Sequence, residues 1–291
     1  MRIVMDFDGV YTDPSDEGEA CSRFFRNKII SLRLNEVGLE SEEKVDSWLG
    51  ELRARQASAP FQYGWRSEGK VSAFTFEDPF LRNIGLADFM DHLAEGGDSR
   101  SARVLAELAK REKIKNFAEL SEWSFHQLNL KKRPDPAARK WVLEALDRGH
   151  EVFIVSNSSS EKIHDFLNQA DFPVEKRPVV RGGAKKFGLG KKPSLIDMGS
   201  FESKSIFVDT DRPLYEAALL EIRPDVVIGD VFCLDLSLPI RLKRENRLAF
   251  SGGIHYRHRD YTPSPMLDLV SGRHTRVPEV TVLRDWDQLS I

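Results

Sequence analysis

The sequence predicts an α/β fold in which helices cover both faces of a parallel sheet. Two observations favour this fold class. Short apolar runs end abruptly in acids, serine or glycine, which is typical of buried strands that enter loops. From residue 134 onward, these runs alternate with helical patterns, as they do in parallel sheets. Because the ligand crevice of such a sheet lies beyond the carboxyl ends of its strands, polar residues there are expected to converge.

The predicted strands are short and apolar, and several lead into a polar residue. They lie at residues 3–5, 152–155, 179–180, 206–208, 226–228, 248–250 and 280–283. At the carboxyl ends of these runs stand Asp6, Ser156, Asp209 and Asp230. These side chains are therefore the first candidates for a functional site.

The predicted helices fill the intervals between the strands. Asp135 can cap a helix whose first turn accommodates Pro136, and Gly149 can end that helix. Two further helices are predicted at residues 161–169 and 214–222. The second of these can serve as a crossover connection, which parallel strands require.

Residues 14–133 interrupt this alternation with mainly helical patterns. Apolar residues between positions 45 and 52 have the i, i+3, i+4, i+7 spacing of one helix face. The segment is long enough for a small core of its own, in which we expect the aromatic residues Trp65, Phe74, Phe76, Phe80 and Phe89. We therefore predict a discontinuous Rossmann-like core, residues 1–13 and 134–291, and a helical inserted domain, residues 14–133.

The composition excludes several classes of protein. The 291 residues carry 43 Lys and Arg against 46 Asp and Glu, a net charge of −3, which argues against a protein that coats nucleic acid or anionic membranes. No apolar run approaches the roughly 20 residues that span a bilayer. Cys21 and Cys233 fit no disulfide or zinc pattern, and the first residues lack the pattern of a signal peptide. We expect a cytoplasmic protein without nucleic-acid or membrane partners.

The segment DFDGVYTD at residues 6–13 combines a nucleophile with an acid. A carboxylate is ionised at neutral pH, so Asp6 can attack phosphorus without an activating base, and water can release the resulting acyl phosphate. Asp8 can protonate the leaving oxygen and later deprotonate that water. Gly9 permits the close backbone approach that a phosphate needs. With its DxDGxxxD pattern, the segment resembles the first motif of phosphatases of the haloacid dehalogenase superfamily.

The resemblance extends to the end of the predicted strand at residues 152–155. The superfamily places a serine or threonine there, which implies that Ser156 hydrogen-bonds a phosphoryl oxygen. Asn157 beside it also resembles many members and is a candidate for phosphate binding. The hydroxyl and nearby backbone N–H groups would stabilise charge on the transferring group.

The third and fourth motifs can be assigned in two ways. In the assignment that we favour, the acids are Asp230 and Asp235, since GDVFCLD at residues 229–235 matches the superfamily's GDxxxxD spacing. The cation would then be Arg212, which stands before Pro213 at the start of the predicted crossover helix. A cation at that place would steady the nucleophile and the phosphoryl charge.

In the other assignment, the acids are Asp209 and Asp211, and the cation is Lys185 or Lys186. This assignment needs residues 187–203 as the crossover connection. Their glycines, a proline and weak apolar periodicity suit a helix poorly, which is why we favour the first assignment. Both lysines remain candidates for phosphate binding in either assignment.

The acids of the motifs imply a bound Mg²⁺. The candidate ligands are the carboxylates of Asp6, Asp230 and Asp235 and the backbone carbonyl of Asp8, an all-oxygen set that suits this ion. Mg²⁺ would offset the repulsion between an anionic nucleophile and an anionic substrate. The motifs thus predict a Mg²⁺-dependent phosphomonoester hydrolase that acts through an aspartyl-phosphate on Asp6, with a small phosphorylated metabolite as substrate.

Three other functions stay open. A phosphomutase of the superfamily uses the same residues. A dehalogenase uses the nucleophile on carbon, although the superfamily's dehalogenases generally lack an acid at the position of Asp8. A catalytically retired member of the fold could act as a regulatory or interaction protein.

Two regions outside the motifs bear on the substrate. The superfamily commonly inserts a cap between its first two motifs, which implies that residues 14–133 select the substrate. Within them, residues 77–80 and Arg82 are the segment in which we expect substrate contacts. The basic stretch at residues 241–259 could hold an anionic leaving group or be ordinary surface charge.

Overall fold

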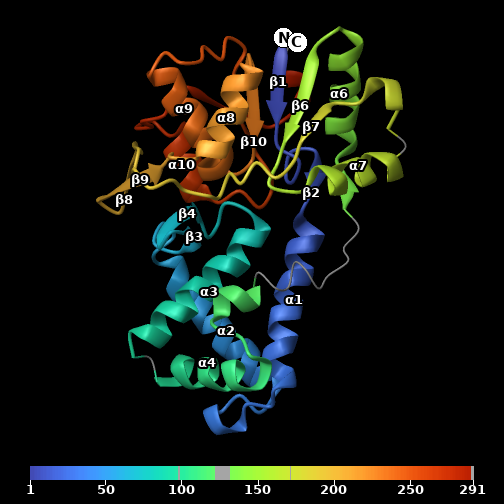
Figure 1. Cartoon of the computed structure of the whole chain (residues 1–291). Helices are drawn as coiled ribbons and strands as arrows, with labels where there is room; N and C mark the ends of the chain where they lie inside the picture. Colours follow the sequence, from blue (N-terminus) through green and yellow to red (C-terminus); the bar gives the residue numbers. More distant parts are fainter. Residues whose placement is uncertain (98, 122–131, 171, 290–291) are drawn as a thin grey trace. The chain divides into compact units, whose positions relative to one another are not determined.

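The chain divides into two compact units. The computed structural model describes residues 1–97, 99–121, 132–170 and 172–289. By contacts between Cα atoms, the core unit comprises Met1–Pro14, Arg66–Ala73 and Lys132–Ile291, and the helical unit comprises Ser15–Trp65 and Phe74–Lys131. Figure 1 traces the elements of both units in sequence colours.

The core unit is built on a six-stranded sheet in which all neighbouring strands are parallel. In sheet order its strands are β12 (Val280–Leu283), β11 (Gly253–Arg257), β10 (Val226–Gly229), β1 (Arg2–Met5), β6 (Glu151–Val155) and β7 (Val179–Arg181). Met5 at the end of β1 pairs with Ile228 of β10 and with Ile154 of β6. The predicted α/β fold class is confirmed, and the carboxyl ends of β1, β6 and β10 lie at one edge of the sheet.

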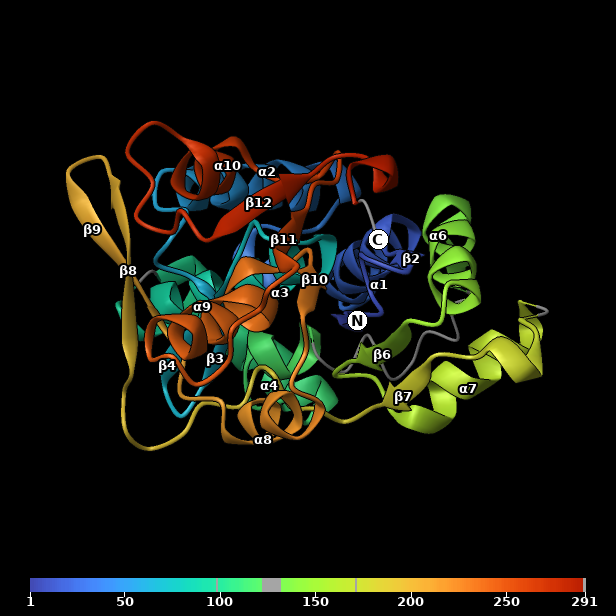
Figure 2. The ribbon, with the colours of Figure 1, turned by 90° about the horizontal axis from the view of Figure 1, so that it is seen from above.

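Helices connect the strands largely as the sequence predicts. α6 (Pro136–Asp147) begins after Asp135, whose carboxylate caps it, and α7 (Ser160–Gln169) begins after Ser159. α8 (Pro213–Ile222) precedes β10. The remaining helical elements of the core unit are α9 (Ser237–Arg244), α10 (Ser264–Ser271) and short turns at Val174–Lys176, Phe232–Leu236 and Trp286–Gln288. Figures 1 and 2 show α6 and α7 next to β6 and β7, and α8 and α9 next to β10.

Burial explains why β1 and β10 occupy the middle of the sheet. Ile3, Val4 and Met5 are at most 1% exposed, and every residue of β10 is buried, as expected for strands covered on both faces. Ile3 and Met5 share a hydrophobic cluster with Trp141 of α6 and Phe166 of α7. This packing makes the edge where β1 and β10 end a rigid platform for side chains.

The predicted strand at residues 206–208 does not belong to this sheet. It lies in β9 (Lys204–Asp209), which pairs antiparallel with β8 (Leu195–Phe201) in a separate two-stranded sheet. Only one face of β9 is covered, since Ile206 and Val208 are buried while Phe207 is 50% exposed. A strand inside a parallel sheet would be covered on both faces, so the prediction that this run is part of the parallel sheet was wrong.

The predicted strand at residues 248–250 is also wrong. No strand covers these residues, and Phe250 has a φ of +47°, in the left-handed region that a strand does not use. The chain instead forms β11 at Gly253–Arg257, which pairs with β10 and β12. Arginine and histidine within β11 conceal its strand character in the sequence, although Ile254 and Tyr256 are fully buried.

The helical unit has a hydrophobic core of its own. Its helices are α1 (Ser15–Ser31), α2 (Glu42–Ala57), α3 (Pro79–Glu95) and α4 (Ser99–Glu112), with a short turn at Asn35–Val37. The core cluster includes Phe25, Trp48, Leu49, Leu86 and Phe89. Of the aromatic residues predicted for this core, Phe89 belongs to the cluster and Phe74 is buried against Phe61, with ring centroids 5.1 Å apart. Trp65, Phe76 and Phe80 are partly exposed, which corrects the prediction for these three.

Two short hairpin-like pairs border the helical segments. β2 (Thr12–Asp13) pairs antiparallel with β5 (Arg133–Pro134), so the chain leaves the core unit and returns to it on neighbouring strands. β3 (Gly64–Ser67) pairs with β4 (Lys70–Phe74). The tip of the second pair, Arg66–Ala73, groups with the core unit although it lies inside the predicted insertion.

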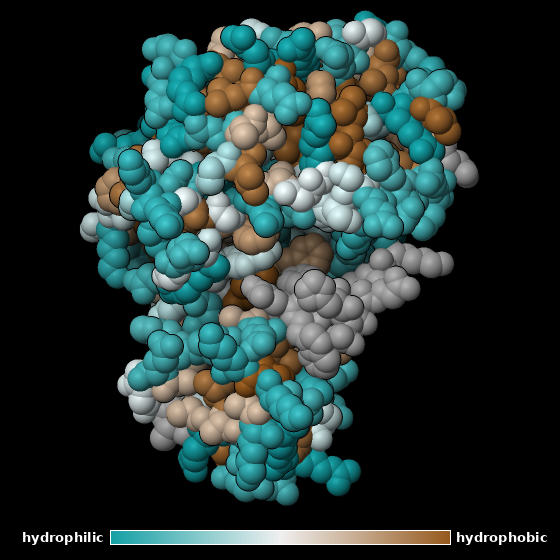
Figure 3. All heavy atoms as spheres, in the orientation of Figure 1, coloured by the Kyte–Doolittle hydropathy of each residue, from teal (hydrophilic) through white to brown (hydrophobic). Residues whose placement is uncertain are grey.

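One face of the molecule is drawn by the hydropathy of its residues in Figure 3. On the face drawn in Figure 3, hydrophilic residues predominate in both units, with smaller hydrophobic areas among them. Among the described residues, none of the helices is both long and apolar enough to cross a membrane.

Candidate active site

Two neighbouring strands bring acids from distant parts of the sequence together. Asp6 follows β1 and Asp230 follows β10, and the Asp6 N–H donates to the carbonyl of Ile228 at 3.0 Å. Asp235 lies in the short turn Phe232–Leu236 that follows. One carboxylate oxygen from each of Asp6, Asp230 and Asp235 lies within 4.8 Å of the other two. We call these three residues the acidic group.

Lys186 is the cation at the acidic group. Its Nζ lies 2.9 Å from Asp6 Oδ1 and 2.8 Å from Asp235 Oδ1, and its side chain is only 1% exposed. Burial by itself would lower the pKa of Lys186, but the carboxylates of Asp235 and Asp6 raise it, so the ammonium stays charged. Burial raises the pKa of Asp6 to about 7, against the lowering effect of Lys186 and with a further rise from Asp235 and Asp8. The charge of Asp6 therefore depends on nearby cations.

Arg212, the cation of the favoured assignment, binds main chain beside the site. It is fully buried, and its guanidinium donates to the Oγ and the carbonyl of Ser72, both at 2.8 Å, and to the carbonyl of Lys186. Ser72 belongs to the tip of the β3–β4 pair, and its own Oγ donates to the carbonyl of Phe187 at 2.7 Å. The acids of the favoured assignment lie beside Asp6, but its cation is corrected: Lys186 contacts them, and Arg212 holds the loop that carries Lys186.

The two adjacent lysines have different environments. Lys185 is exposed and has a φ of +45°, so the backbone turns sharply between it and the buried Lys186. The Lys186 N–H donates to Asn157 Oδ1 at 2.6 Å. Asn157, a predicted phosphate ligand, therefore orients the Lys186 backbone, and the structure gives Lys185 a place on the surface.

The acids of the other assignment lie elsewhere. Asp209 pairs with Lys70 at 3.3 Å and accepts the N–H of Ser194 at 3.0 Å. Asp211 accepts the N–H of Lys192 at 3.1 Å. Within the described part of the chain, neither acid belongs to the acidic group. The reason is that Asp209 ends β9 and Asp211 follows it, and β9 is not a strand of the parallel sheet.

Serines after β6 link Asp8 to the site. Ser156 is 1% exposed, and its Oγ accepts the N–H of Ser158 at 3.1 Å. The Ser158 hydroxyl in turn donates to Asp8 Oδ2 at 3.1 Å. The sequence reasoning placed Ser156 at the site but missed Ser158. The only sequence feature that points to Ser158 is the run of serines in this loop, and such a run is equally typical of an ordinary turn.

Lys132 is a second cation that the sequence reasoning missed. Its Nζ forms an ion pair with Asp8 Oδ1, and its side chain is 6% exposed. Burial would raise the pKa of Asp8, but the charge and hydrogen bond of Lys132, helped by Lys162 and Ser158, hold it below its usual value. Lys132 stands in the basic run before β5, and only the return of the chain at that point brings it to Asp8.

Gly9 makes room for Asp230. Its φ is +78°, and a Cβ built on it would lie 1.8 Å from Asp230 Oδ2. Any other residue would therefore displace one carboxylate of the acidic group, besides adopting an unfavourable backbone conformation.

We expect Gly9→Ala to reduce any metal-dependent activity by about 10²-fold, because a shift of about 1 Å in a reacting group has an effect of that size. Gly38→Ala is the matched control, since Gly38 has a φ of +73° and nothing within 4 Å of its Cβ position. Both variants should lose stability through backbone strain, by about 1–2 kcal/mol. Measuring turnover and urea unfolding for each variant separates the loss of activity from the loss of stability. Equal losses of activity in both variants would contradict a specific role for the space at Gly9.

Arg259 holds the loop that follows the nucleophile. Its guanidinium donates to the carbonyls of Gly9 at 2.5 Å, Val10 at 3.2 Å and Thr12 at 3.3 Å, and to Asp135 Oδ2 at 2.7 Å. Two residues later, Tyr261 donates its hydroxyl proton to Asp230 Oδ2 at 2.7 Å. The segment after β11 thus positions both the first motif loop and a carboxylate of the acidic group.

We expect Arg259→Met to lower the free energy of unfolding by about 2–4 kcal/mol, because buried carbonyls and a carboxylate lose a charged donor. Arg247→Met is the control. Its arginine pairs with Glu216 at 2.6 Å but is 39% exposed, so the loss should stay below about 1 kcal/mol. Urea unfolding of both variants measures the difference, and equal stability losses would contradict the holding role of Arg259.

The basic stretch at residues 241–259 is largely paired within the core unit. Arg241 and Arg247 contact Glu216, and Arg244 contacts Glu279. Because these guanidinium groups have acidic partners, the stretch reads as structural charge rather than as a binding strip for an anion.

Comparisons with known proteins find likeness only among solved structures. No family model matches the chain, and no curated protein does. One matching structure is provisionally described as a phosphoglycolate phosphatase from Lactobacillus delbrueckii subsp. bulgaricus, with 14% identity, a TM-score of 0.44, and coverage of 99% of this chain and 95% of the other. Another is provisionally described as a β-phosphoglucomutase from Thermotoga maritima, with 12% identity, a TM-score of 0.41, and coverage of 99% and 96%.

A third matching structure is a haloacid dehalogenase-like family hydrolase from Streptococcus pneumoniae, with 13% identity, a TM-score of 0.36, and coverage of 99% and 96%. Identities and TM-scores this low transfer neither an activity nor a substrate to this chain. The parallel sheet and the residues gathered at its carboxyl edge are features of the chain itself. The structure itself therefore shows the predicted α/β fold, a parallel sheet with an acidic group at the carboxyl ends of its central strands.

Proposed function

We propose that this protein is a Mg²⁺-dependent phosphomonoester hydrolase that acts through an aspartyl-phosphate on Asp6. The observation that carries the proposal is the acidic group itself, with Asp6, Asp230 and Asp235 within 4.8 Å of one another and Lys186 at 2.9 Å from Asp6. Such a group at the end of a central strand matches the chemistry that a phosphoryl-transfer nucleophile requires.

The donor atoms fit Mg²⁺. All are hard oxygens. Among the described residues, Lys186 is the one ammonium paired with the acidic group, through Asp6 and Asp235, so a divalent cation would neutralise the excess negative charge. Asp6 and Asp230, with the backbone carbonyl of Asp8, would hold the ion. Both oxygens of Asp235 already accept hydrogen bonds, from Lys186 Nζ and from the Val231 N–H at 3.0 Å, so Asp235 supports Lys186 instead. When bound, Mg²⁺ would neutralise charge on the phosphoryl group and orient it for in-line attack.

In the first half of the reaction, a carboxylate oxygen of Asp6 attacks phosphorus. The new bond joins Asp6 to phosphorus, and the bond from phosphorus to the ester oxygen breaks. For this step Asp8 must first carry a proton, which it gives to that leaving oxygen, and it leaves the step as a carboxylate. Ser156 would donate its hydroxyl proton to a phosphoryl oxygen, while Lys186 holds Asp6 in place and offsets its charge.

In the second half, water attacks the phosphorus of the aspartyl-phosphate. Asp8, now a carboxylate, takes a proton from that water, and the bond between phosphorus and Asp6 breaks. Lys132 and Ser158 hold the two oxygens of Asp8 and favour its ionised form. An ionised Asp8 suits the base of the second step. The presence of this second acid also favours phosphoryl transfer over dehalogenation, because the superfamily's dehalogenases generally lack an acid at this position.

The test is hydrolysis of p-nitrophenyl phosphate and of a panel of small phosphorylated metabolites, with Mg²⁺ and with EDTA. We expect turnover that needs Mg²⁺. Because a phosphomutase shares these residues, the panel should include sugar phosphates analysed for isomers as well as for inorganic phosphate. If the protein binds Mg²⁺ by calorimetry but hydrolyses nothing on the panel, the phosphatase proposal fails. If turnover is the same in EDTA, the metal dependence fails.

A further inference from the structure

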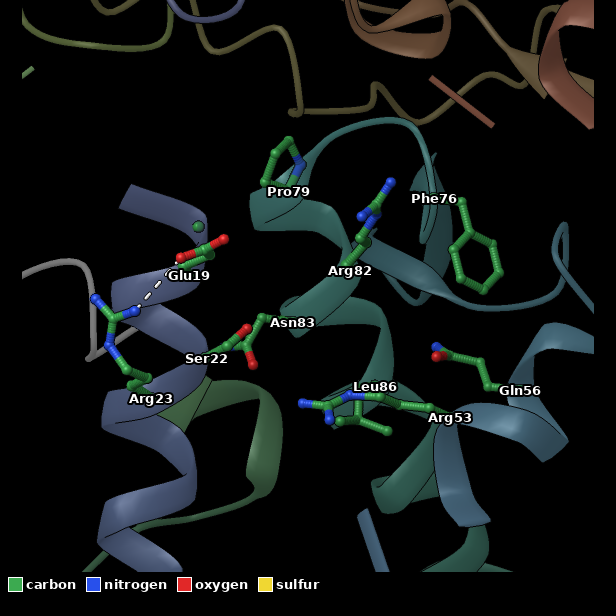
Figure 4. A pocket seen from close by; sticks show the side chains of 11 residues that line it. Glu19, Ser22, Arg23, Arg53, Gln56, Phe76, Pro79, Arg82, Asn83 and Leu86 are labelled. Atoms are coloured by element: carbon green, nitrogen blue, oxygen red, sulfur yellow. Dashed lines mark hydrogen bonds and ion pairs between the residues drawn. The ribbon is translucent and has the colours of Figure 1, made fainter. Parts of the chain in front are cut away.

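The helical unit contains a cavity of about 510 Å³ between α1, α2 and α3. It is lined by side chains of mixed character, and Figure 4 shows them from close by. Among them, Glu19 and Arg23 come from α1, Arg53 comes from α2, and Arg82, Asn83 and Leu86 come from α3. Three of these residues are arginines and one is an acid, so the lining is cationic.

Arg53 differs from the other two arginines of the lining, since each of those has an interaction of its own. Glu19 offsets Arg23, with which it pairs at 3.4 Å on the exposed side of α1. Within the described part of the chain, Arg53 makes no hydrogen bond and no close ion pair. Asp46, the acid whose field reaches Arg53, is itself held by Arg26 at 2.5 Å. Figure 4 shows the Arg53 side chain extending from α2 toward the space between α1 and α3.

Arg53 is an exposed residue, although neighbouring groups cover part of it. Burial lowers the pKa of Arg53, and Asp46 offsets only part of that effect. An arginine nevertheless stays charged at neutral pH. A charged donor in these surroundings is stabilised by an anion, and a planar fork of N–H groups matches a carboxylate or phosphate.

Asn83, a residue of the lining, has a buried polar atom without a partner in the part of the chain that the structure describes. Its Nδ2 donates to Ser121 Oγ at 2.9 Å, but its Oδ1 is buried without a hydrogen-bond partner among the described residues, and the residue is 2% exposed. A buried carbonyl oxygen without a donor costs free energy, and a small rotation of the side chain into the cavity would let a ligand hydroxyl recover it. Ser22 from α1 also lines the cavity. Gln56 of the lining is buried, and its Nε2 donates a hydrogen bond to Thr75 Oγ1 at 3.1 Å.

We propose that this cavity binds an organic oxyanion, a carboxylate or phosphate carried on a hydroxylated carbon skeleton. Arg53 binds the anionic group, and Asn83 Oδ1 accepts a hydrogen bond from a ligand hydroxyl. Leu86, Pro79 and Phe76 face the carbon skeleton. The cavity lies wholly within the helical unit, so this binding does not require the core unit to be a phosphatase.

The test is calorimetric titration of the full chain in EDTA with L-malate, which carries carboxylates and a hydroxyl, and with glycerol, which carries hydroxyls alone. We expect malate to bind and glycerol not to bind measurably. Arg53→Gln should weaken malate at least about tenfold, the size expected for a lost charged hydrogen bond. Arg55→Gln is the matched control, because Arg55 lies on the same helix outside the cavity lining, and it should leave the dissociation constant within twofold.

Asn83→Asp gives a second readout, since it places a like charge in the cavity at nearly constant volume and should abolish malate binding. Equal malate binding by wild type and Arg53→Gln would overturn the proposal, as would no binding of malate at millimolar concentration. Circular dichroism of each variant verifies folding, and a loss of binding in a folded Arg53→Gln protein with binding intact in Arg55→Gln supports the proposal.

The anion could be part of the substrate or a separate effector, and kinetics distinguishes these sources. If it is part of the substrate, Arg53→Gln raises KM for phosphate esters that carry a second anionic group and leaves p-nitrophenyl phosphate unchanged. If it is an effector, malate changes the turnover of p-nitrophenyl phosphate in wild type and not in Arg53→Gln. Because binding is read by calorimetry, failure of the proposed hydrolase activity leaves this test intact.

Discussion

Replacing Lys186 with methionine is expected to lower the free energy of unfolding by about 3–5 kcal/mol at neutral pH, because removing one partner of a buried ion pair leaves the other uncompensated. Lys186 is 1% exposed and lies within 2.9 Å of Asp6 and 2.8 Å of Asp235. Methionine keeps most of the side-chain volume, so the loss of stability reflects the missing charge and not an empty cavity. Urea unfolding in EDTA measures it.

The effect of this substitution should depend on pH in a definite direction. Burial raises the pKa of Asp6 to about 7 even with Lys186 present, and without the ammonium it would rise further. A carboxyl whose pKa is higher in the folded state than in the unfolded state binds protons preferentially when folded. Folding of the protein is therefore more favourable at low pH, and the free energy of unfolding falls as the pH rises. The penalty of Lys186→Met should accordingly shrink between pH 7 and pH 5.

Two variants control this experiment. Lys185→Met removes an exposed lysine next in sequence and should change stability by less than about 0.5 kcal/mol. The double variant Lys186→Met/Asp235→Asn removes one of the stranded charges and should recover part of the loss, as a double-mutant cycle reveals. If Lys186→Met were as stable as wild type at pH 7, the acidic group would not depend on this lysine.

Replacing Asp6 with asparagine is expected to reduce phosphate-ester turnover by more than about 10³-fold, since an amide is not a nucleophile and the residues of such a site act as a unit. The stability of the variant should change little or rise slightly above pH 7. The raised pKa of Asp6 means that its charge is disfavoured in the folded protein, so a neutral amide of the same shape removes that penalty. Initial rates with p-nitrophenyl phosphate and urea unfolding on the same samples measure both quantities.

Asp211→Asn is the matched control for this variant. Asp211 is the acid of the other motif assignment, and it accepts the Lys192 N–H outside the acidic group. It should keep wild-type activity within a few-fold. Wild-type turnover by Asp6→Asn would contradict the proposed nucleophile, and a large loss in Asp211→Asn would reopen the other assignment.

Some of the site follows from local sequence pattern. The apolar run at residues 3–5, followed by two acids and a glycine, indicates a buried strand that ends in a loop, and β1 has that form. Asp135 before Pro136 indicates a helix start, and α6 begins there. These features depend on neighbours in sequence, so propensity, capping and burial patterns suffice to predict them.

The prediction of which strands form the parallel sheet failed where two segments have the same sequence pattern. Residues 206–208 and 226–228 are equally short and apolar, yet only the second lies in the parallel sheet. What separates them is coverage: β9 has one buried face, whereas every residue of β10 is buried. Coverage depends on elements that pack from far along the chain, which a single strand's sequence does not record.

The partners of the acids were equally out of reach of the sequence. Lys132 reaches Asp8 where the chain returns to the core unit, and Arg259 reaches the loop at Gly9 from beyond β11. In the sequence around each of them, nothing distinguishes either residue from a basic residue on the surface. Their roles arise from long-range contacts, which only the folded chain establishes.

The sequence by itself determined the fold class, the order of most elements and the strand and loop that carry Asp6 and Asp8, because strand burial and helix capping are local. Only the tertiary structure decided which acids join Asp6 and which cation accompanies them. It took Asp230 and Asp235 from one assignment and Lys186 from the other. The physical reason is that strand adjacency in a parallel sheet sets which loop ends meet, and adjacency is fixed by packing between distant segments.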